Sequence, residues 1–349
     1  MIRLALIAFV TALLVSLAGT PASIWLARRF GAMDPVDPRK IHLEPRPRWG
    51  GIGIMAGFFA AILTVWRSGP LFGKLLGFSQ GILQNKKVLF TLNLGEQLAG
   101  ILFGTALLFI VGLVDDRKPV KAGMKFLFQI IAAYVAMTYG VRIYGLSVPG
   151  MEAYANFPLW FMQVITVLWL VGLSNAVNLI DGLDGLAAGV AAIVAGSFLA
   201  VALIQEGTRS VLFFHQMRLA GIIAAALSGG ALGFLVYNFF PARVFMGDSG
   251  SLSLGFLIAC VAVIGAFKTT VLAVLLVPFL LVAVPVTDMA VAFGRRLLSR
   301  QNPFAPDRGH FHHRLLDSGW TQREVVFLVY AITLLLSCIS ITVVALRKG

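Results

Sequence analysis

Carboxylates, amides and histidines gather in five short polar stretches of an otherwise apolar chain. The stretches span residues 39–51, 114–125, 175–186, 240–252 and 306–319. Carboxylates bind hard divalent cations, whereas Lys, Arg and His side chains bind the oxygens of phosphate groups. These residue types together predict a site at which charged, phosphate-bearing substrates react.

An adjacent acidic pair, Asp115 and Asp116, precedes a basic run that includes Lys125. Neighbouring carboxylates near a low-dielectric boundary repel each other and require a counter-charge. Mg²⁺ supplies one, and it prefers oxygen ligands that it shares with substrate phosphates. The alternative is a solvated acidic pair that the basic residues after it neutralise.

The sequence NAVNLIDGLDGL carries two amides and two carboxylates, Asn175, Asn178, Asp181 and Asp184. Because residues three apart share a helical face, the first three would lie together if the segment is helical. Polar residues this dense at a membrane boundary indicate a functional site. The alternative is polar contact between helices followed by a turn.

Two further carboxylates lie at predicted span ends. Asp248 follows a glycine where a span begins, so it is either a metal ligand or a helix N-cap, and the two roles are compatible. Asp288 lies inside the predicted span 270–293, where an ionisable group indicates function or a structural pair with Arg295 or Arg296.

Three histidines, His310, His312 and His313, lie in the longest predicted loop beside Arg308 and Arg314. Zinc fits poorly, because no cysteine or fourth ligand is near. Hydrogen bonds from this loop to phosphate or sugar fit its basic neighbours better, and a purely structural loop is the alternative.

The first polar stretch carries Lys40, His42 and Arg48, which either anchor the chain to the membrane surface or contact an anion. The following GIGIMAG (51–57) superficially matches a dinucleotide-binding glycine pattern. It lies in an apolar segment without a βαβ unit, so the glycines indicate helix packing instead.

The elements that position these residues are membrane spans. The mean hydropathy is +0.90, with 59% hydrophobic and 12% charged residues, which excludes an ordinary soluble domain. We expect an all-α, polytopic membrane protein, with residues 1–349 forming one domain. Both cysteines lie in apolar runs, so a disulfide framework is excluded. No pattern in residues 67–93 predicts a structure. The ten expected spans are 4–26, 50–66, 94–114, 124–140, 159–177, 186–205, 219–240, 251–267, 270–293 and 324–346.

An even number of spans separates successive polar stretches, so all five should emerge on one side of the membrane. All acidic residues except Glu96, Glu152 and Glu206 belong to that side, which also has the excess of Lys and Arg. By the positive-inside rule this side is cytoplasmic and both termini are extracytoplasmic. The net charge of +13 then reflects topology and anionic lipid rather than nucleic acid.

The five stretches in this order resemble the polyprenyl-phosphate N-acetylhexosamine-1-phosphate transferase family, whose superfamily includes the phospho-N-acetylmuramoyl-pentapeptide transferases. The similarity covers residues 39 to 319. It runs through RKIHLEPRPRWGG, GLVDDRKPVKAGMKFLFQ, NAVNLIDGLDGLAAG, FPARVFMGDSGSLSLGF and VPVTDMAVAFGRRLLSRQNPFAPDRGHFHHRLLDSG.

The resemblance implies a multi-pass enzyme of the inner (cytoplasmic) membrane whose active site faces the cytoplasm. It would use Mg²⁺, with Mn²⁺ as a substitute, to move a sugar-1-phosphate from a UDP-N-acetylhexosamine to undecaprenyl or another polyprenyl phosphate. UMP would leave, and the lipid product would open a cell-envelope glycan pathway such as cell wall or lipopolysaccharide synthesis. A homodimer is a further expectation.

Site residues carried over from the resemblance fall into four groups. The metal ligand is Asp248, and the catalytic centre is Asp115, Asp116 and Lys125. Nucleotide and sugar contacts are Asn175, Asn178, Asp181, Asp184, His310, His312, His313 and Arg314. Lipid-phosphate or diphosphate contacts are Lys40, His42 and Arg48.

The H-x-H-H-R form of GHFHHRLL favours the branch that uses UDP-N-acetylglucosamine. UDP-MurNAc-pentapeptide and other UDP-N-acetylhexosamines are the alternatives. Direct attack by the lipid phosphate and a covalent aspartyl intermediate both stay open. A secondary transporter is the rival of another class, but the chain lacks an internal repeat and its polar residues lie at one face rather than the midplane.

Overall fold

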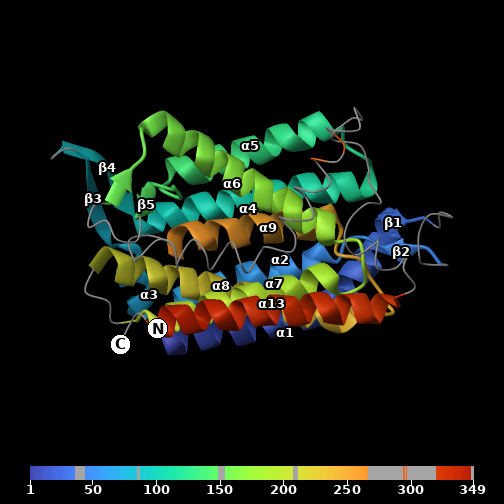
Figure 1. Cartoon of the computed structure of the whole chain (residues 1–349). Coiled ribbons are helices and arrows are strands. Elements are labelled where there is room, and N and C mark those ends of the chain that lie inside the picture. Colours follow the sequence, from blue (N-terminus) through green and yellow to red (C-terminus); the bar gives the residue numbers. More distant parts are fainter. Residues whose placement is uncertain are drawn as a thin grey trace.

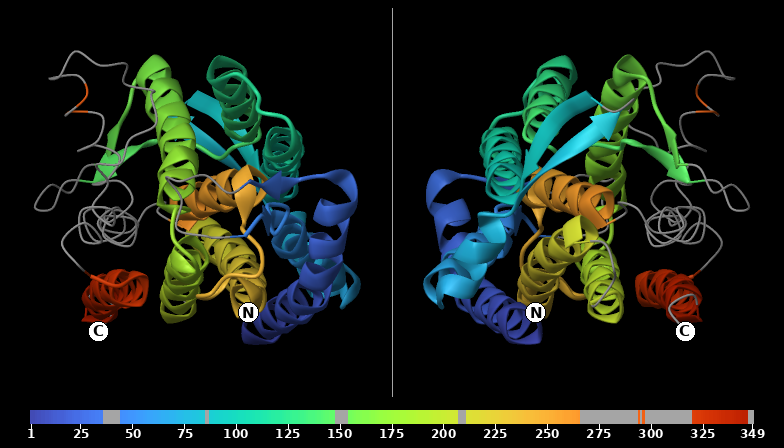
Figure 2. Two further views of the ribbon diagram at one scale, coloured as in Figure 1. Left: turned by 90° about the vertical axis from the view of Figure 1, so that its right-hand side faces the viewer. Right: turned by 90° about the vertical axis from the view of Figure 1, so that its left-hand side faces the viewer.

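A computed structural model shows an elongated bundle of helices that lie side by side along its long axis (Figure 1). Figure 2 shows the same helices end-on, with α9 enclosed by its neighbours. The structure describes residues 1–35, 44–84, 87–147, 154–206, 211–265, 294, 296 and 320–346.

Each predicted span within the described residues is a helix, because long apolar runs satisfy their backbone hydrogen bonds internally. The seventh begins earlier than expected, and the predicted span 270–293 lies outside the described residues. The helices are α1 (Ile2–Phe30), α2 (Gly51–Arg67), α4 (Leu94–Arg117), α5 (Ala122–Thr138), α6 (Leu159–Ile180), α7 (Leu186–Ile204), α8 (Val211–Asn238), α9 (Gly247–Gly265) and α13 (Gln322–Leu346).

Short elements add to the all-helical expectation without changing the membrane core. Strands pair antiparallel in three two-stranded hairpins: β1 (Met33–Asp34) with β2 (Arg46–Pro47), β3 (Ser79–Gln84) with β4 (Lys87–Asn93), and β5 (Gly145–Ser147) with β6 (Tyr154–Asn156). The segment 67–93, which the sequence left uninterpreted, forms helix α3 (Pro70–Leu76) and the β3–β4 hairpin. Both lie at the end of the bundle opposite β1 and β2 (Figure 1).

The helices make this a multi-pass membrane protein. Seven of the described helices are individually long and apolar enough to cross a bilayer. Helices α2 and α3 satisfy the same criterion only together, with a bend of 103° between them, and α5 is a shorter apolar helix. Large apolar side chains such as Leu6, Phe103 and Leu335 are exposed on the outside of the bundle, as lipid contact requires.

Small residues let the central helices approach closely. The glycines of GIGIMAG pack α2 against α1, where a methyl group on Gly57 would lie 2.6 Å from the carbonyl oxygen of Ala12. One on Gly53 would collide with Thr20. The helix-packing interpretation of this motif is therefore confirmed.

The described parts of the first four polar stretches lie at one end of the bundle, beside β1 and β2 (Figure 1). There α1, α4, α6 and α8 end, and α2, α5, α7 and α9 begin. The prediction of a shared side is confirmed for these stretches, whereas the fifth, 306–319, lies outside the described residues. The arrangement gathers side chains that are far apart in sequence around one helix end.

Candidate active site

Asp115 lies where α4 turns into α5. The turn brings Lys125, one turn into α5, back across the end of α4, and its Nζ lies 3.2 Å from Asp115 Oδ2. The other carboxylate oxygen accepts a hydrogen bond of 2.8 Å from the backbone N–H of Val120 in the turn. Asp115 is therefore held by its own loop and by one ammonium group.

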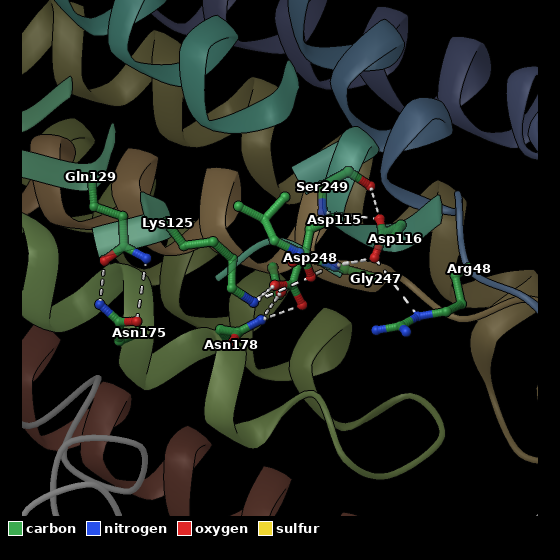
Figure 3. Close-up of polar contacts among 12 residues, drawn as sticks. Arg48, Asp115, Asp116, Lys125, Gln129, Asn175, Asn178, Gly247, Asp248 and Ser249 are labelled. Atoms are coloured by element: carbon green, nitrogen blue, oxygen red, sulfur yellow. Dashed lines mark hydrogen bonds and ion pairs between the residues drawn. The ribbon is translucent and has the colours of Figure 1, made fainter. Parts of the chain in front are cut away.

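The same ammonium reaches the first turn of α9. Lys125 Nζ lies 2.8 Å from Asp248 Oδ2, so it bridges two carboxylates (Figure 3). Asn178 near the end of α6 donates to Asp248 Oδ1 at 3.0 Å and to Ser251 Oγ at 2.8 Å. Four helices thus bring together the predicted residues Asp115, Lys125, Asn178 and Asp248.

Asp116 differs from its neighbour because its carboxylate binds the start of α9. Its Oδ1 accepts a hydrogen bond of 2.8 Å from the backbone N–H of Asp248. Its Oδ2 accepts bonds of 3.2 and 2.8 Å from the backbone N–H and hydroxyl of Ser249. The side chain has no exposed surface. Asp116 is therefore a cap supplied by another helix, and it satisfies N–H groups that α9 leaves open.

Two glycines allow this approach. Gly247 is the first residue of α9 and has φ +72°, and a methyl group there would collide with the carbonyl oxygen of Arg48 and the carboxylate of Asp116. A methyl group on Gly112 in α4 would collide with the backbone of Ser249. Only hydrogen fits at either position, which explains the glycine before Asp248.

Arg48 follows β2 and carries positive charge to the far side of the carboxylates (Figure 3). Its Nε lies 3.7 Å from Asp116 Oδ1, and its Nη1 lies 3.7 Å from Asp34 Oδ1. The side chain remains partly exposed. Lys40 and His42, predicted from the same stretch, lie outside the described residues.

Asn175 and Asp184 make structural contacts that the sequence alternative anticipated. Asn175 and Gln129 exchange hydrogen bonds between α6 and α5, at 2.5 and 3.3 Å. Asp184 Oδ2 accepts a bond of 2.8 Å from the backbone N–H of Ala242, which ties the α6–α7 loop to the α8–α9 loop. Their contacts with a nucleotide stay predictions.

Asp181 lies directly after α6, near the other acidic groups. Burial raises the pKa of its carboxyl to about 8, and the carboxylates of Asp248 and Asp116 raise it further than Arg48 lowers it. At neutral pH this carboxyl therefore retains a proton unless a cation offsets the neighbouring charge.

The donor set fits a magnesium ion that substrate oxygens complete. In the part of the chain that the structure describes, no three His, Cys, Asp or Glu side chains form a ready-made metal site. Mg²⁺ instead usually takes one or two carboxylates together with substrate phosphates. Asp115 and Asp248 both contact the single ammonium of Lys125, so one cation can serve both carboxylates.

Some predicted and some unexpected residues remain to be placed. His310, His312, His313, Arg314 and Asp288 lie outside the described residues, so their roles stay predictions. Asp34 and Gln129 were not identified from the sequence. Each contacts a site residue on another element, and no local pattern gives that pairing.

Comparison with known proteins gives consistent relatives. Residues 98–266 match glycosyl transferase family 4. A probable undecaprenyl-phosphate N-acetylglucosaminyl 1-phosphate transferase of Bacillus subtilis is 34% identical over 97% of this chain and 84% of its own length. A decaprenyl-phosphate N-acetylglucosaminephosphotransferase of Mycobacterium leprae is 34% identical over 87% of this chain and 75% of its own length. A phospho-N-acetylmuramoyl-pentapeptide-transferase of Desulforudis audaxviator is 33% identical over 96% of this chain and 97% of its own length.

Proposed function

This chain belongs to glycosyl transferase family 4, and we propose that it transfers N-acetylglucosamine-1-phosphate from UDP-N-acetylglucosamine to a polyprenyl phosphate. Relatives that match most of the chain carry that activity in their names. Residues 1–349 act as one catalytic domain in this proposal. The products are a polyprenyl diphosphate sugar and UMP.

One observation supports this reaction above the rest: a lysine bridges two carboxylates at the shared end of several apolar helices. A lipid phosphate lies at the membrane surface, whereas a nucleotide sugar arrives from water. A charged site at helix ends is where the two can meet. The polar groups therefore lie where this pair of substrates requires them.

The chemistry exchanges one phosphoanhydride for another. An oxygen of the lipid phosphate attacks the β-phosphorus of the UDP-sugar, and the bond from that phosphorus to the bridging oxygen breaks. UMP leaves with the bridging oxygen and its electron pair. Asp115, with one oxygen beside Lys125, is the residue that orients the attacking phosphate or takes its proton.

Repulsion between two anionic substrates is the first barrier, and the positive side chains reduce it. Lys125 and Arg48 flank the carboxylates, so each can neutralise one phosphate group (Figure 3). Asp248 would hold Mg²⁺ or Mn²⁺, which would stabilise negative charge on the diphosphate.

The remaining predicted residues recognise the nucleotide sugar in this proposal. Asn178 and Asp181 lie beside Asp248 and are assigned to the uridine part of the substrate. The loop with His310, His312, His313 and Arg314 is assigned to the diphosphate and sugar. Lys40 and His42 join Arg48 as contacts for the lipid phosphate or the diphosphate.

The site faces the cytoplasm of an inner-membrane protein in this proposal, because UDP-sugars are made there. The excess of Lys and Arg on the site's side supports that orientation. A homodimer through the outer helices is the proposed assembly.

The test uses purified protein with undecaprenyl phosphate, Mg²⁺ and UDP-[¹⁴C]GlcNAc, followed by extraction into butanol. Label should enter the organic phase and should disappear with EDTA. If label is not transferred from UDP-GlcNAc but sugar is transferred from UDP-GalNAc or UDP-MurNAc-pentapeptide, that nucleotide sugar becomes the proposed substrate. If folded protein transfers sugar from none of the three nucleotide sugars, the proposal is refuted.

The same protein distinguishes the two reaction routes. Incubation with the UDP-sugar alone should leave the protein unlabelled, because direct transfer requires the lipid phosphate. A phosphorylated aspartate trapped under those conditions would instead establish the covalent route.

A further inference from the structure

We propose that Asp34 is a positioning residue that aims Arg48 at a substrate phosphate. This inference rests on the proposed phosphoryl transfer and adds a residue to it. Asp34 lies outside the five polar stretches, and its role depends on a pairing that only the fold reveals.

The β1–β2 pairing fixes the geometry. Asp34 lies opposite Arg46, and the backbone N–H of Arg48 donates to the carbonyl oxygen of Ala32 at 3.0 Å. Residues 34 and 48 are therefore diagonal neighbours on one face of the ribbon, within reach of long side chains. Asp34 is only 7% exposed, so its carboxylate is withdrawn from water next to the guanidinium.

Two carboxylates hold the guanidinium from different sides. Asp34 lies 3.7 Å from Arg48 Nη1, and Asp116 lies 3.7 Å from Arg48 Nε. A guanidinium has five N–H donors in a rigid plane, so these two partners leave donors for a third anion. With 31% of its side chain exposed, Arg48 remains accessible to that anion.

The carboxylate of Asp34 fixes the orientation of the Arg48 guanidinium. Asp116 is also bound by the backbone of α9, so by itself it fixes one edge of the guanidinium. Asp34 fixes a second edge, which prevents rotation about the first contact. Arg48 then keeps its place opposite Lys125, and each of the two phosphates has one cation (Figure 3).

The phosphate bound by Arg48 belongs either to the lipid or to the UDP-sugar, and kinetics distinguish these sources. Asp34→Asn should raise the KM for one of the two substrates by about tenfold, while kcat changes less, because the oriented donors bind ground state and transition state alike. The substrate whose KM rises identifies the phosphate.

A double-mutant cycle separates positioning from general structural support. Asp34→Asn should have no further effect on KM when Arg48→Gln is already present, since its effect requires the guanidinium. Asp34→Glu should restore part of the lost affinity. Glu44→Gln is the matched control, because Glu44 is an exposed carboxylate just before β2, 4.0 Å from Arg46.

Binding of inorganic pyrophosphate gives a readout independent of turnover. Pyrophosphate should raise the melting temperature of wild type and of Glu44→Gln more than that of Asp34→Asn. The proposal would be overturned if Asp34→Asn raised KM equally in the wild-type and Arg48→Gln backgrounds. It would also be overturned if pyrophosphate raised the melting temperature of all variants equally. Wild-type protein that binds pyrophosphate but transfers no sugar would instead refute the proposed function.

Discussion

Asp116→Asn should weaken the fold at α9 rather than remove a reacting group. The carboxylate accepts three hydrogen bonds from Asp248 and Ser249. An asparagine keeps one acceptor oxygen, so it loses one charge-assisted bond, worth about 1.5–3 kcal/mol, and weakens the other two by about 1 kcal/mol each. The free energy of unfolding should therefore fall by about 4 kcal/mol.

The assay compares thermal unfolding with sugar transfer in the same detergent preparation. Asp116→Asn should melt well below wild type, and added Mg²⁺ should not restore its activity. Asp115→Asn should remain nearer wild type in melting temperature, because Asp115 accepts one backbone N–H, from Val120 in its own turn, whereas Asp116 accepts two from the start of α9. That variant should nevertheless lose most of its turnover.

A different result would refute this assignment of Asp116. If Asp116→Asn melts with wild type and yet transfers no sugar, its carboxylate acts in the reaction and the capping role is secondary. If both aspartate variants lose stability equally, the distinction between the two neighbours fails.

Four further outcomes are expected. Asp248→Asn should abolish label transfer while the protein stays folded, because it removes the carboxylate that is the proposed metal ligand. Gly51→Ala should lower the melting temperature and the activity, since its methyl group would collide with the backbone of Gly250 in α9. In EDTA, the melting temperature should fall as pH rises from about 4 toward about 8. Asp181, whose pKa is about 8, then holds a proton that the unfolded chain, at the ordinary value of 3.8, has lost. His312→Ala should reduce kcat on the order of 100-fold if the loop stabilises charge on the diphosphate.

Each outcome has its own control. Near-normal transfer by Asp248→Asn with Mg²⁺ would remove the metal assignment. Gly73→Ala in α3 should behave as wild type, because a methyl group there meets nothing within 4 Å. The fall in melting temperature should flatten in Asp181→Asn, and a persistent slope would assign it to another group. An unchanged rate for His312→Ala would leave its loop structural.

Much of the fold could be predicted because membrane spans depend on local composition. Continuous apolar runs predicted the helices named above within the described residues, apart from the short α3. The β3–β4 hairpin was missed since its strands mix polar and apolar residues and pair only with each other. It lies at the end of the bundle opposite the site (Figure 1).

The site was predictable where its residues are chemically unusual, and less so where geometry assigns roles. Asp115, Lys125 and Asp248 were identified because charge is rare in such a chain, and the structure brings them together. No sequence pattern distinguishes Asp116 from Asp115, because the difference arises when α9 begins against α4. Asp34 was missed for the same reason, since its contact with Arg48 depends on the β1–β2 pairing.

The two neighbouring aspartates also differ in when their partners become available during synthesis. Asp115 meets Lys125 only 10 residues later, so a nascent chain can neutralise it as soon as α5 emerges. Arg48 precedes Asp116 in the chain, but the N–H of Asp248 follows 132 residues later, so the hydrogen bonds from Asp116 to α9 must wait for most of the bundle to be translated. Until then its charge favours water over lipid, which would keep the end of α4 at the membrane surface while the later helices insert. The catalytic centre is therefore complete only after α9 has been synthesised.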